Sequence, residues 1–269
     1  MTGDATYLDR ILAAKRAELA AARRERNTTL TERQIEQALA GLGPTRDFTA
    51  AIRSGPAPRV IAEFKRASPS AGVIRESASV EDVVVAYERA GAAAISVLTD
   101  RHFQGSLADL ERARAVTSLP ILRKDFIVER SQILEARQAG ADAVLLIVAA
   151  LPPPTLKHFV DFAHELQLDV LCEAHDAHEL DRAMAAGCRL VGINNRDLRT
   201  FAVDLDLSIE LRHHVPPTFT YVAESGISTV EHLRRLQDAG IDAALIGSSL
   251  MSSDDPAAAL RELLDGVYG

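Results

Sequence analysis

Four short segments of the chain resemble one another and recur at nearly equal intervals. Each places an Ala-Gly pair before an apolar run: AGAAAISVL from Ala90, AGADAVLLI from Ala139, AGCRLVGIN from Ala186 and AGIDAALIG from Ala239. Glycine favours the left-handed conformation that ends a helix, and a strand begins a few residues later. The intervals between the four glycines are 49, 47 and 53 residues. Each interval is long enough for two strand-plus-helix units.

A second apolar segment completes each unit. These segments are RVIAEFK from Arg59, PILRKDF from Pro120, LDVLCEA from Leu168 and FTYVAES from Phe219. All eight segments are rich in Val, Ile and Leu and do not alternate cleanly, which is typical of a parallel sheet buried on both faces. The pattern predicts an α/β fold, a (β/α)8 TIM barrel. The alternative is a doubly wound open sheet, which usually has fewer strands and a GxGxxG turn that is not found here.

Residues 1–57 precede the first predicted strand. The apolar residues on one face of a first predicted helix are Leu8, Ile11, Leu12 and Leu19. A second helix is expected from Glu32 to Leu42. We therefore predict a single (β/α)8 barrel domain over residues 1–269, with residues 1–57 as an N-terminal helical extension packed on it.

The charge balance narrows the class of ligand. The 269 residues include 30 Lys and Arg against 38 Asp and Glu, a net charge of −8. Nucleic acids and anionic membranes require clustered cations, so we expect neither as a partner. Only two cysteines are present, and neither a signal peptide nor a membrane-spanning run is found, which favours a cytoplasmic protein. The oligomeric state stays open, and a monomer is compatible with the sequence.

Polar residues interrupt the apolar strands where these strands end. In a barrel of this type the chemistry lies at the carboxyl ends of the strands. The polar residues at those ends are Glu63, Lys65, Lys124, Glu173, Asn194, Arg196 and Glu224. Each carries a desolvation cost, and lysines beside carboxylates separate acid and base roles at neutral pH. We predict an active site here; the alternative is a set of structural ion pairs.

The loops after the seventh and eighth predicted strands carry a different signal. ESGIS and IGSSLM place the small residues Ser225, Gly226, Gly247 and Ser248 before helices. Backbone N–H groups in such loops can face an anion, and barrels of this type often bind phosphate at these two loops. We predict a small phosphorylated ligand; the alternative is that the glycines only form tight turns.

Cys172, His175 and His178 have a spacing that a metal site could use. If Glu173 points into the barrel, however, its neighbour Cys172 points out toward the helices. We therefore favour a packed thiol with two surface histidines, and we expect no metal.

The segment VIAEFKRASPSAG, Val60 to Gly72, closely resembles the first-strand signature of the indole-3-glycerol-phosphate synthase family. The later motifs HFQGS, ILRKDFIV, GINNRDL, AESGI and IGSSLM resemble those of the family in the same order. The similarity extends over about residues 55–265, and the extension resembles the extra helices of that family. The resemblance implies a tryptophan-pathway carboxy-lyase that needs no cofactor.

The implied substrate is 1-(2-carboxyphenylamino)-1-deoxyribulose 5-phosphate. Ring closure, decarboxylation and dehydration yield indole-3-glycerol phosphate. On this reading Lys124 is the general acid, helped by Lys65 and Glu63, and Lys65 is the acid of the dehydration. Glu173 is the base, and Glu224 orients hydroxyls or a lysine.

The remaining residues are expected to bind the substrate. Asn194 and Arg196 would hold the aromatic carboxylate or a hydroxyl, and Phe103 and Phe126 would flank the ring. The phosphate would be held by Ser68 together with the two small-residue loops. Two alternatives remain, namely another phosphate-binding barrel such as a phosphoribosylanthranilate isomerase, and a non-catalytic scaffold.

Overall fold

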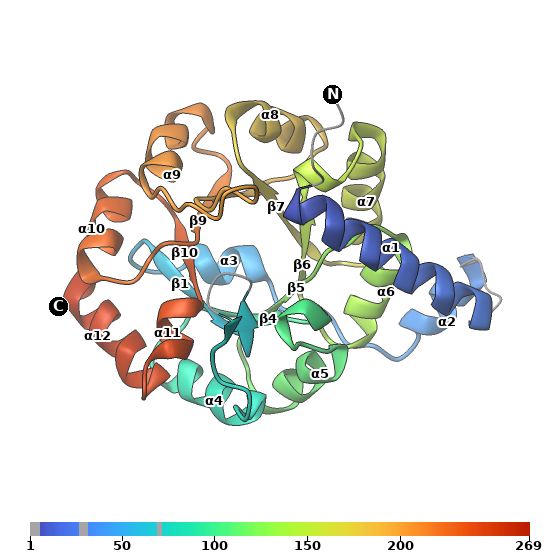
Figure 1. The fold of residues 1–269 in the computed structure, drawn as a ribbon, viewed down its shortest axis with the longest axis horizontal. Coiled ribbons are helices and arrows are strands. Elements are labelled where there is room, and N and C mark those ends of the chain that lie inside the picture. Colours follow the sequence, from blue (N-terminus) through green and yellow to red (C-terminus); the bar gives the residue numbers. More distant parts are fainter. Residues whose placement is uncertain (1–5, 27–31, 69–71) are drawn as a thin grey trace.

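Eight parallel strands close into a barrel in the computed structural model, which describes residues 6–26, 32–68 and 72–269 (Figure 1). The strands are β1 (Arg59–Phe64), β4 (Ala94–Leu98), β5 (Ile121–Lys124), β6 (Ala143–Ile147), β7 (Asp169–Ala174), β8 (Leu190–Asn194), β9 (Thr220–Glu224) and β10 (Ala243–Ile246). Each strand pairs with its neighbours along the chain, and β10 closes the ring onto β1. The predicted barrel and all eight predicted strands are confirmed.

Helices surround the barrel on its outside (Figure 1). They are α4 (Val80–Arg89), α5 (Leu107–Val116), α6 (Arg130–Gln138), α7 (Pro153–Glu165), α8 (Ala177–Ala185), α9 (Asp206–Leu211), α10 (Val230–Asp238), α11 (Ser248–Ser252) and α12 (Pro256–Tyr268). Short 3-10 turns η1 (Arg101–Phe103), η2 (Val148–Ala150) and η3 (Arg212–His214) and a hairpin of β2 (Ala67–Ser68) and β3 (Gly72–Val73) lie in the loops.

The four repeated glycines end helices as predicted. Gly91, Gly140, Gly187 and Gly240 have φ angles of 98°, 90°, 93° and 70°, the left-handed region that favours glycine. Each follows the C-cap alanine of a helix, and a barrel strand begins within a few residues. The repeat therefore reflects four helix-to-strand turns at the amino end of the barrel.

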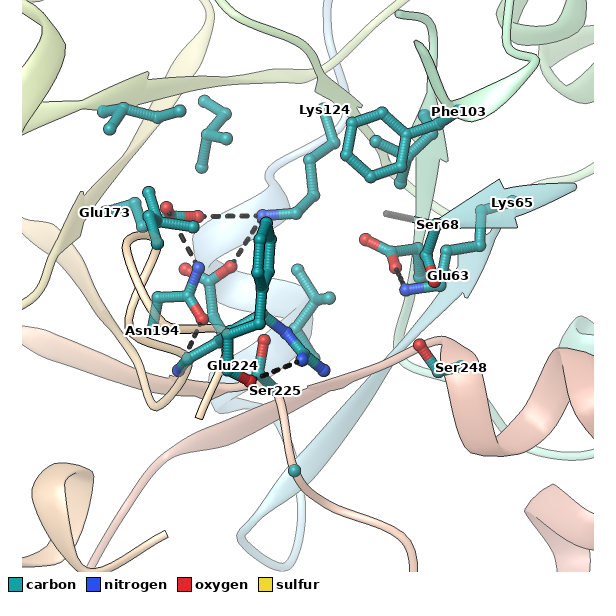
Figure 2. Close-up of a pocket in the computed structure, with 18 of the residues that line it drawn as sticks. Glu63, Lys65, Ser68, Phe103, Lys124, Glu173, Asn194, Glu224, Ser225 and Ser248 are labelled. Atoms are coloured by element: carbon teal, nitrogen blue, oxygen red, sulfur yellow. Dashed lines mark hydrogen bonds and ion pairs between the residues drawn. The ribbon is translucent and has the colours of Figure 1, made fainter. Parts of the chain in front are cut away.

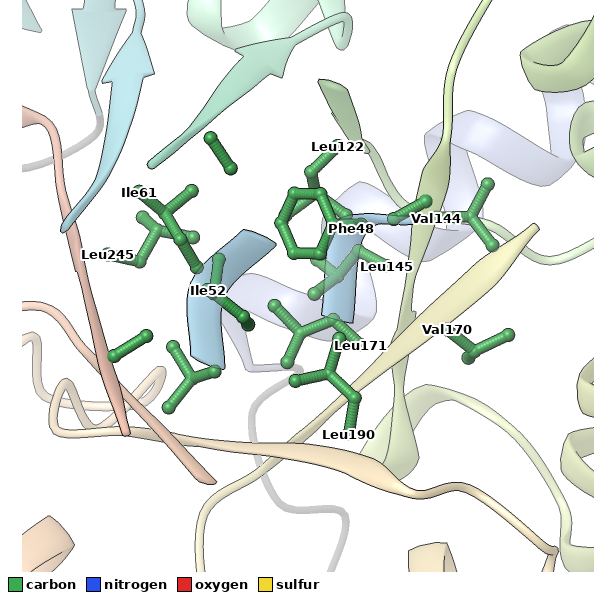
Figure 3. Close-up of a cluster of buried hydrophobic side chains, with 14 of the residues drawn as sticks. Phe48, Ile52, Ile61, Leu122, Val144, Leu145, Val170, Leu171, Leu190 and Leu245 are labelled. Carbon is green, nitrogen blue, oxygen red and sulfur yellow. The ribbon is translucent and has the colours of Figure 1, made fainter. Parts of the chain in front are cut away.

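A short helix, α3 (Phe48–Arg53), closes that amino end. Its Phe48 and Ile52 are fully buried against the apolar side chains that fill the barrel (Figure 3). The backbone N–H of Thr49 donates to Asp169 Oδ2 at 2.8 Å, where Asp169 begins β7. Helix α3 therefore fills the amino end of the barrel. A cavity inside the barrel can open only at the other end, where the strands finish.

The N-terminal segment begins with α1 (Tyr7–Arg26) and α2 (Glu32–Leu39). On α1, Ile11 and Leu12 are buried as predicted. Helix α2 ends three residues before the predicted Leu42, because Gly41 has a φ of 88° and breaks the helix. Among the described residues, none of the helices is both long and apolar enough to cross a bilayer.

Candidate active site

A cavity of about 270 Å³ opens at the carboxyl ends of the strands. It collects the predicted site residues from seven strands and their loops, with Gly247 as the exception. Those that line it are Glu63, Lys65, Ser68, Phe103, Lys124, Phe126, Glu173, Asn194, Arg196, Glu224, Ser225, Gly226 and Ser248. The structure therefore brings together side chains that are up to 185 residues apart in the sequence.

Lys124 lies at the centre of an ionic cluster (Figure 2). Its Nζ is 3.0 Å from Glu173 Oε2 and 2.8 Å from Glu224 Oε2. Asn194 Nδ2 donates to the other oxygen of Glu173, Oε1, at 3.2 Å. The lysine side chain is 15% exposed and both glutamates are almost fully buried. One ammonium group thus faces two carboxylates in a site that is largely shielded from water.

The strand register explains this convergence. Asn194 of β8 pairs with Glu224 of β9, and Glu173 of β7 pairs with Gly192 of β8. A side chain on Gly192 would place its Cβ 2.5 Å from Glu224 Oε1. Glycine at this position therefore leaves the space that the Glu224 carboxyl occupies.

The two glutamates differ in their pKa. Burial raises the pKa of Glu224, and the repulsion from Glu173 adds to it, so the pKa reaches about 7 despite the attraction of Lys124. Burial acts in the same direction on Glu173, but Lys124 and His175 outweigh it and hold its pKa at about 2. Burial alone would lower the pKa of Lys124, yet Glu173 and Glu224 raise it above its usual value. Near neutral pH the cluster therefore holds a charged lysine, an ionised Glu173 and a Glu224 that exchanges its proton.

A second ionic pair lies on the other side of the cavity (Figure 2). Lys65 Nζ is 2.6 Å from Glu63 Oε1, with Ser68 and Ser248 nearby. Gly247 does not line the cavity. A Cβ at Gly247 would lie 2.3 Å from Glu63 Oε1, so this glycine makes room for the glutamate.

The buried carboxylates favour the active-site interpretation over structural ion pairs. Glu63 Oε2 and Glu224 Oε1 are buried and have no hydrogen-bond partner within the part of the chain that the structure describes. Each such oxygen carries a desolvation cost, and because both glutamates line the cavity, a bound ligand can offset it.

The two loops expected to bind phosphate border the cavity together. Ser225 and Gly226 follow β9 with left-handed φ angles of 67° and 80°. Such a φ is uncommon for serine and marks a loop whose shape is imposed by its surroundings. Ser249 Oγ, after β10, donates to the Ile227 carbonyl at 3.0 Å and ties the two loops together.

Aromatic rings form an apolar wall. Phe103 and Phe126 stack with centroids 6.3 Å apart and an interplanar angle of 27°. Tyr7 of α1 meets Phe201 edge to face at 5.0 Å, and both line the cavity. Sequence reasoning missed Tyr7 and Phe201, because neither lies at a strand end and their contact joins the first helix to a distant loop.

Arg196 has no acidic partner among the residues described. Its Nη1 donates to the Phe201 carbonyl at 3.1 Å, and burial lowers its pKa. The backbone N–H of Arg196 donates to Asn194 Oδ1 at 3.1 Å. A guanidinium that is held in place but not neutralised can bind a carboxylate from a ligand.

The prediction of a surface histidine is wrong for His175. Its side chain is 20% exposed, with Nε2 3.6 Å from Glu173 Oε1 and Nδ1 3.1 Å from Glu179 Oε2. The residue lies directly after β7, so it shares the strand end with Glu173. Cys172 is fully buried and His178 is exposed, as predicted. In the described ranges no three His, Cys, Asp or Glu side chains are grouped to hold a metal ion.

Solved structures with similar backbones show the same fold at low sequence identity. A thiamine phosphate pyrophosphorylase from Pyrococcus furiosus superimposes with a TM-score of 0.61 at 18% identity, covering 82% of this chain and 98% of that one. A mutant tryptophan synthase α-subunit from the same organism gives 0.60 at 15% identity, covering 77% and 98%. These similarities establish the fold alone.

Proteins matched by their sequence share a much higher identity with this chain than these two structures do. The chain is 48% identical over 260 residues to the indole-3-glycerol phosphate synthase of Koribacter versatilis, covering 96% of this chain and 98% of that protein. It is 46% identical to the protein of the same name from Burkholderia vietnamiensis, covering 95% and 98%. The family model described as indole-3-glycerol phosphate synthase matches residues 8–263. The chain belongs to the indole-3-glycerol phosphate synthase family.

Proposed function

We propose that this chain is an indole-3-glycerol-phosphate synthase, a carboxy-lyase of tryptophan biosynthesis. It converts 1-(2-carboxyphenylamino)-1-deoxyribulose 5-phosphate into indole-3-glycerol phosphate, carbon dioxide and water. The observation that carries the proposal is the position of Lys124 between Glu173 and Glu224, in a cavity with aromatic rings and two small-residue loops on its walls. Membership of the family supports the identity of the substrate.

Ring closure needs a positive group at the ketone. The ring carbon that bears the carboxylate attacks the ketone carbon, and the ketone oxygen becomes a hydroxyl as it takes a proton. Lys124 supplies the charge and the proton, because its two carboxylates keep it ionised. Loss of carbon dioxide then returns the bonding electrons to the ring and restores its aromaticity.

Dehydration needs an acid and a base on the same intermediate. The hydroxyl leaves as water with a proton from Lys65, and Glu173 removes a proton from the adjacent ring carbon. Glu173 is ionised at neutral pH and can accept that proton. The Lys65–Glu63 pair and the Lys124 cluster lie on opposite sides of the cavity (Figure 2), so the acid and the base can reach different atoms.

The other cavity residues bind and orient the substrate. Arg196 and Asn194 hold the aromatic carboxylate, and Phe103 and Phe126 flank the ring. The phosphate is held by the loops after β9 and β10, through Ser225, Gly226 and Ser248, together with Ser68, which lines the same cavity. Gly247 instead makes room for Glu63. Glu224 orients a substrate hydroxyl or Lys124.

The chain is further proposed to act as a single domain in the cytoplasm. Contacts of α1 with the barrel loops support the first statement, and two buried free thiols, Cys172 and Cys188, support the second.

The test is turnover of the proposed substrate by the purified chain. We expect indole fluorescence to rise and carbon dioxide to form in equal amounts, with no turnover of phosphoribosylanthranilate, the substrate of an isomerase. A folded chain that gives no indole product contradicts the proposal. Turnover of phosphoribosylanthranilate alone would favour the isomerase alternative.

A further inference from the structure

A lysine of the N-terminal helix is buried beside two aspartates of the barrel. Lys15 of α1 is 5% exposed. Its Nζ lies 2.6 Å from Asp100 Oδ2 and 3.1 Å from Asp125 Oδ1. Asp100 and Asp125 are themselves 0% and 3% exposed. Burial alone would lower the pKa of Lys15, but the two carboxylates raise it, so the lysine is charged. Lys15 thus joins the loops that follow β4 and β5.

Asp100 fixes the short turn that carries Phe103. It is the N-cap of η1, and its Oδ1 accepts the backbone N–H of His102 at 2.8 Å and contacts His102 Nδ1 at 2.7 Å. The pairing with Lys15 uses the other oxygen, Oδ2. The aspartate therefore holds the turn with one oxygen and α1 with the other.

Asp125 holds the backbone of Phe126 in a similar way. It directly follows Lys124, and its Oδ1 accepts the backbone N–H of Phe126 at 2.8 Å as well as facing Lys15. Its Oδ2 accepts from Thr99 Oγ1 at 2.6 Å and from Arg123 at 3.0 Å. Phe126 is thus held at the backbone by a carboxylate that Lys15 helps to neutralise.

We infer that Lys15 is a positioning residue, which holds Phe103 and Phe126 in their stacked arrangement through Asp100 and Asp125. Without its charge Asp100 would be a fully buried carboxylate with His102 as its one remaining partner in the described ranges, and such a group is costly. The η1 turn would then shift to admit water, and the aromatic wall would lose its shape. The inference rests on the proposed function only in assigning the substrate's aromatic ring to this wall.

The same lysine could instead serve only to dock α1, whose Tyr7 and Leu8 also line the cavity. Two variants separate these roles. Asp100→Asn keeps an oxygen for the N-cap but removes the charge that pairs with Lys15. Leu12→Ala loosens α1 through its buried apolar face and leaves Lys15 and both aspartates unchanged.

The experiment measures kcat, KM and melting temperature for wild type, Lys15→Met, Asp100→Asn and Leu12→Ala. Lys157→Met, on an exposed pair with Asp161, is the control for lost charge. We expect KM to rise about tenfold in Lys15→Met and Asp100→Asn with kcat within about threefold, because a wall that binds the ground state and the transition state alike changes KM alone. The inhibition constant of inorganic phosphate should stay within twofold.

The inference is overturned if Lys15→Met and Asp100→Asn keep the wild-type KM. It is also overturned if Leu12→Ala raises KM by the same factor at an equal loss of melting temperature, since docking of α1 would then explain the effect. If Lys15→Met does not fold, Asp100→Asn alone decides the outcome. Absence of turnover by wild type would contradict the proposed function and not the role of Lys15, so the two failures are distinguishable.

Discussion

Gly247→Ala should disable the Glu63–Lys65 pair through a steric clash with Glu63. The φ of Gly247 is −132°, outside the left-handed region that favours glycine, so the contacts of the new methyl group are the main change. Its carbon would lie 2.3 Å from Glu63 Oε1, 2.9 Å from Glu63 Cβ and 3.0 Å from Glu63 Cδ. The nearest of these is 1.1 Å short of an ordinary contact at 3.4 Å. Glu63 must therefore move away and release Lys65, which it now holds at 2.6 Å.

The magnitude follows from the cost of overpacking a buried site. Forcing a methyl group into such a space costs about 1–3 kcal/mol. If Glu63 must return to its wild-type position for catalysis, that cost appears in the barrier, as roughly a 5- to 150-fold loss of kcat/KM. The assay is the steady-state formation of indole-3-glycerol phosphate, with circular dichroism to show that the variant is folded.

A matched control and a double variant test whether the clash with Glu63 causes the loss of activity. Gly43→Ala adds a methyl group where, apart from the chain neighbours of Gly43, no atom of the described residues lies within 4 Å, and it should leave kcat/KM unchanged. In a Glu63→Ala background the 2.3 Å contact is gone and only the Cβ contact remains, so Gly247→Ala should cost less there than in wild type. Equal costs in both backgrounds would refute the reasoning.

Two further predictions concern the Lys124 cluster. Lys124→Met should lower kcat at least a hundredfold if Lys124 is the general acid, whereas Lys157→Met should not, and a Lys124 variant within a few-fold of wild type removes that role. The pKa of Glu224 rises from 4.5 to about 7 on folding, so its contribution to stability is fully present below pH 4.5 and is lost as pH rises through 7. Glu224→Gln should therefore gain up to about 3 kcal/mol relative to wild type between pH 4.5 and 8 in urea unfolding; parallel pH curves would contradict the shift.

The barrel was predictable because its signals are local. Four of the barrel helices, α4, α6, α8 and α10, end at a glycine with a left-handed φ, and each strand is a short apolar run. Candidate site residues such as Lys124 and Glu173 were found by two general rules, the period of two along a strand and the placement of chemistry at strand ends. Both rules need only the strand boundaries.

Features that depend on distant partners were not predictable. Helix α3 has six residues, too few for a periodic pattern. Asp169, 120 residues later, accepts the backbone N–H of Thr49 in the helix, and Asp142 accepts that of Arg46 just before it. From the sequence, Lys15 cannot be told from an ordinary polar residue of a surface helix, because Asp100 and Asp125 come near it only in the folded chain. A spacing rule likewise could not separate a turn glycine from Gly247, whose role is the space it leaves for Glu63.

The most direct test of the account is a crystal structure of the chain with indole-3-glycerol phosphate bound. We predict the indole ring against Phe103 and Phe126 with Lys124 facing the atoms that react, and the phosphate between the loops that carry Ser225 and Ser248. A product found outside this cavity, or bound with its phosphate against Lys124 and its ring at the two loops, would contradict the assignment of the site.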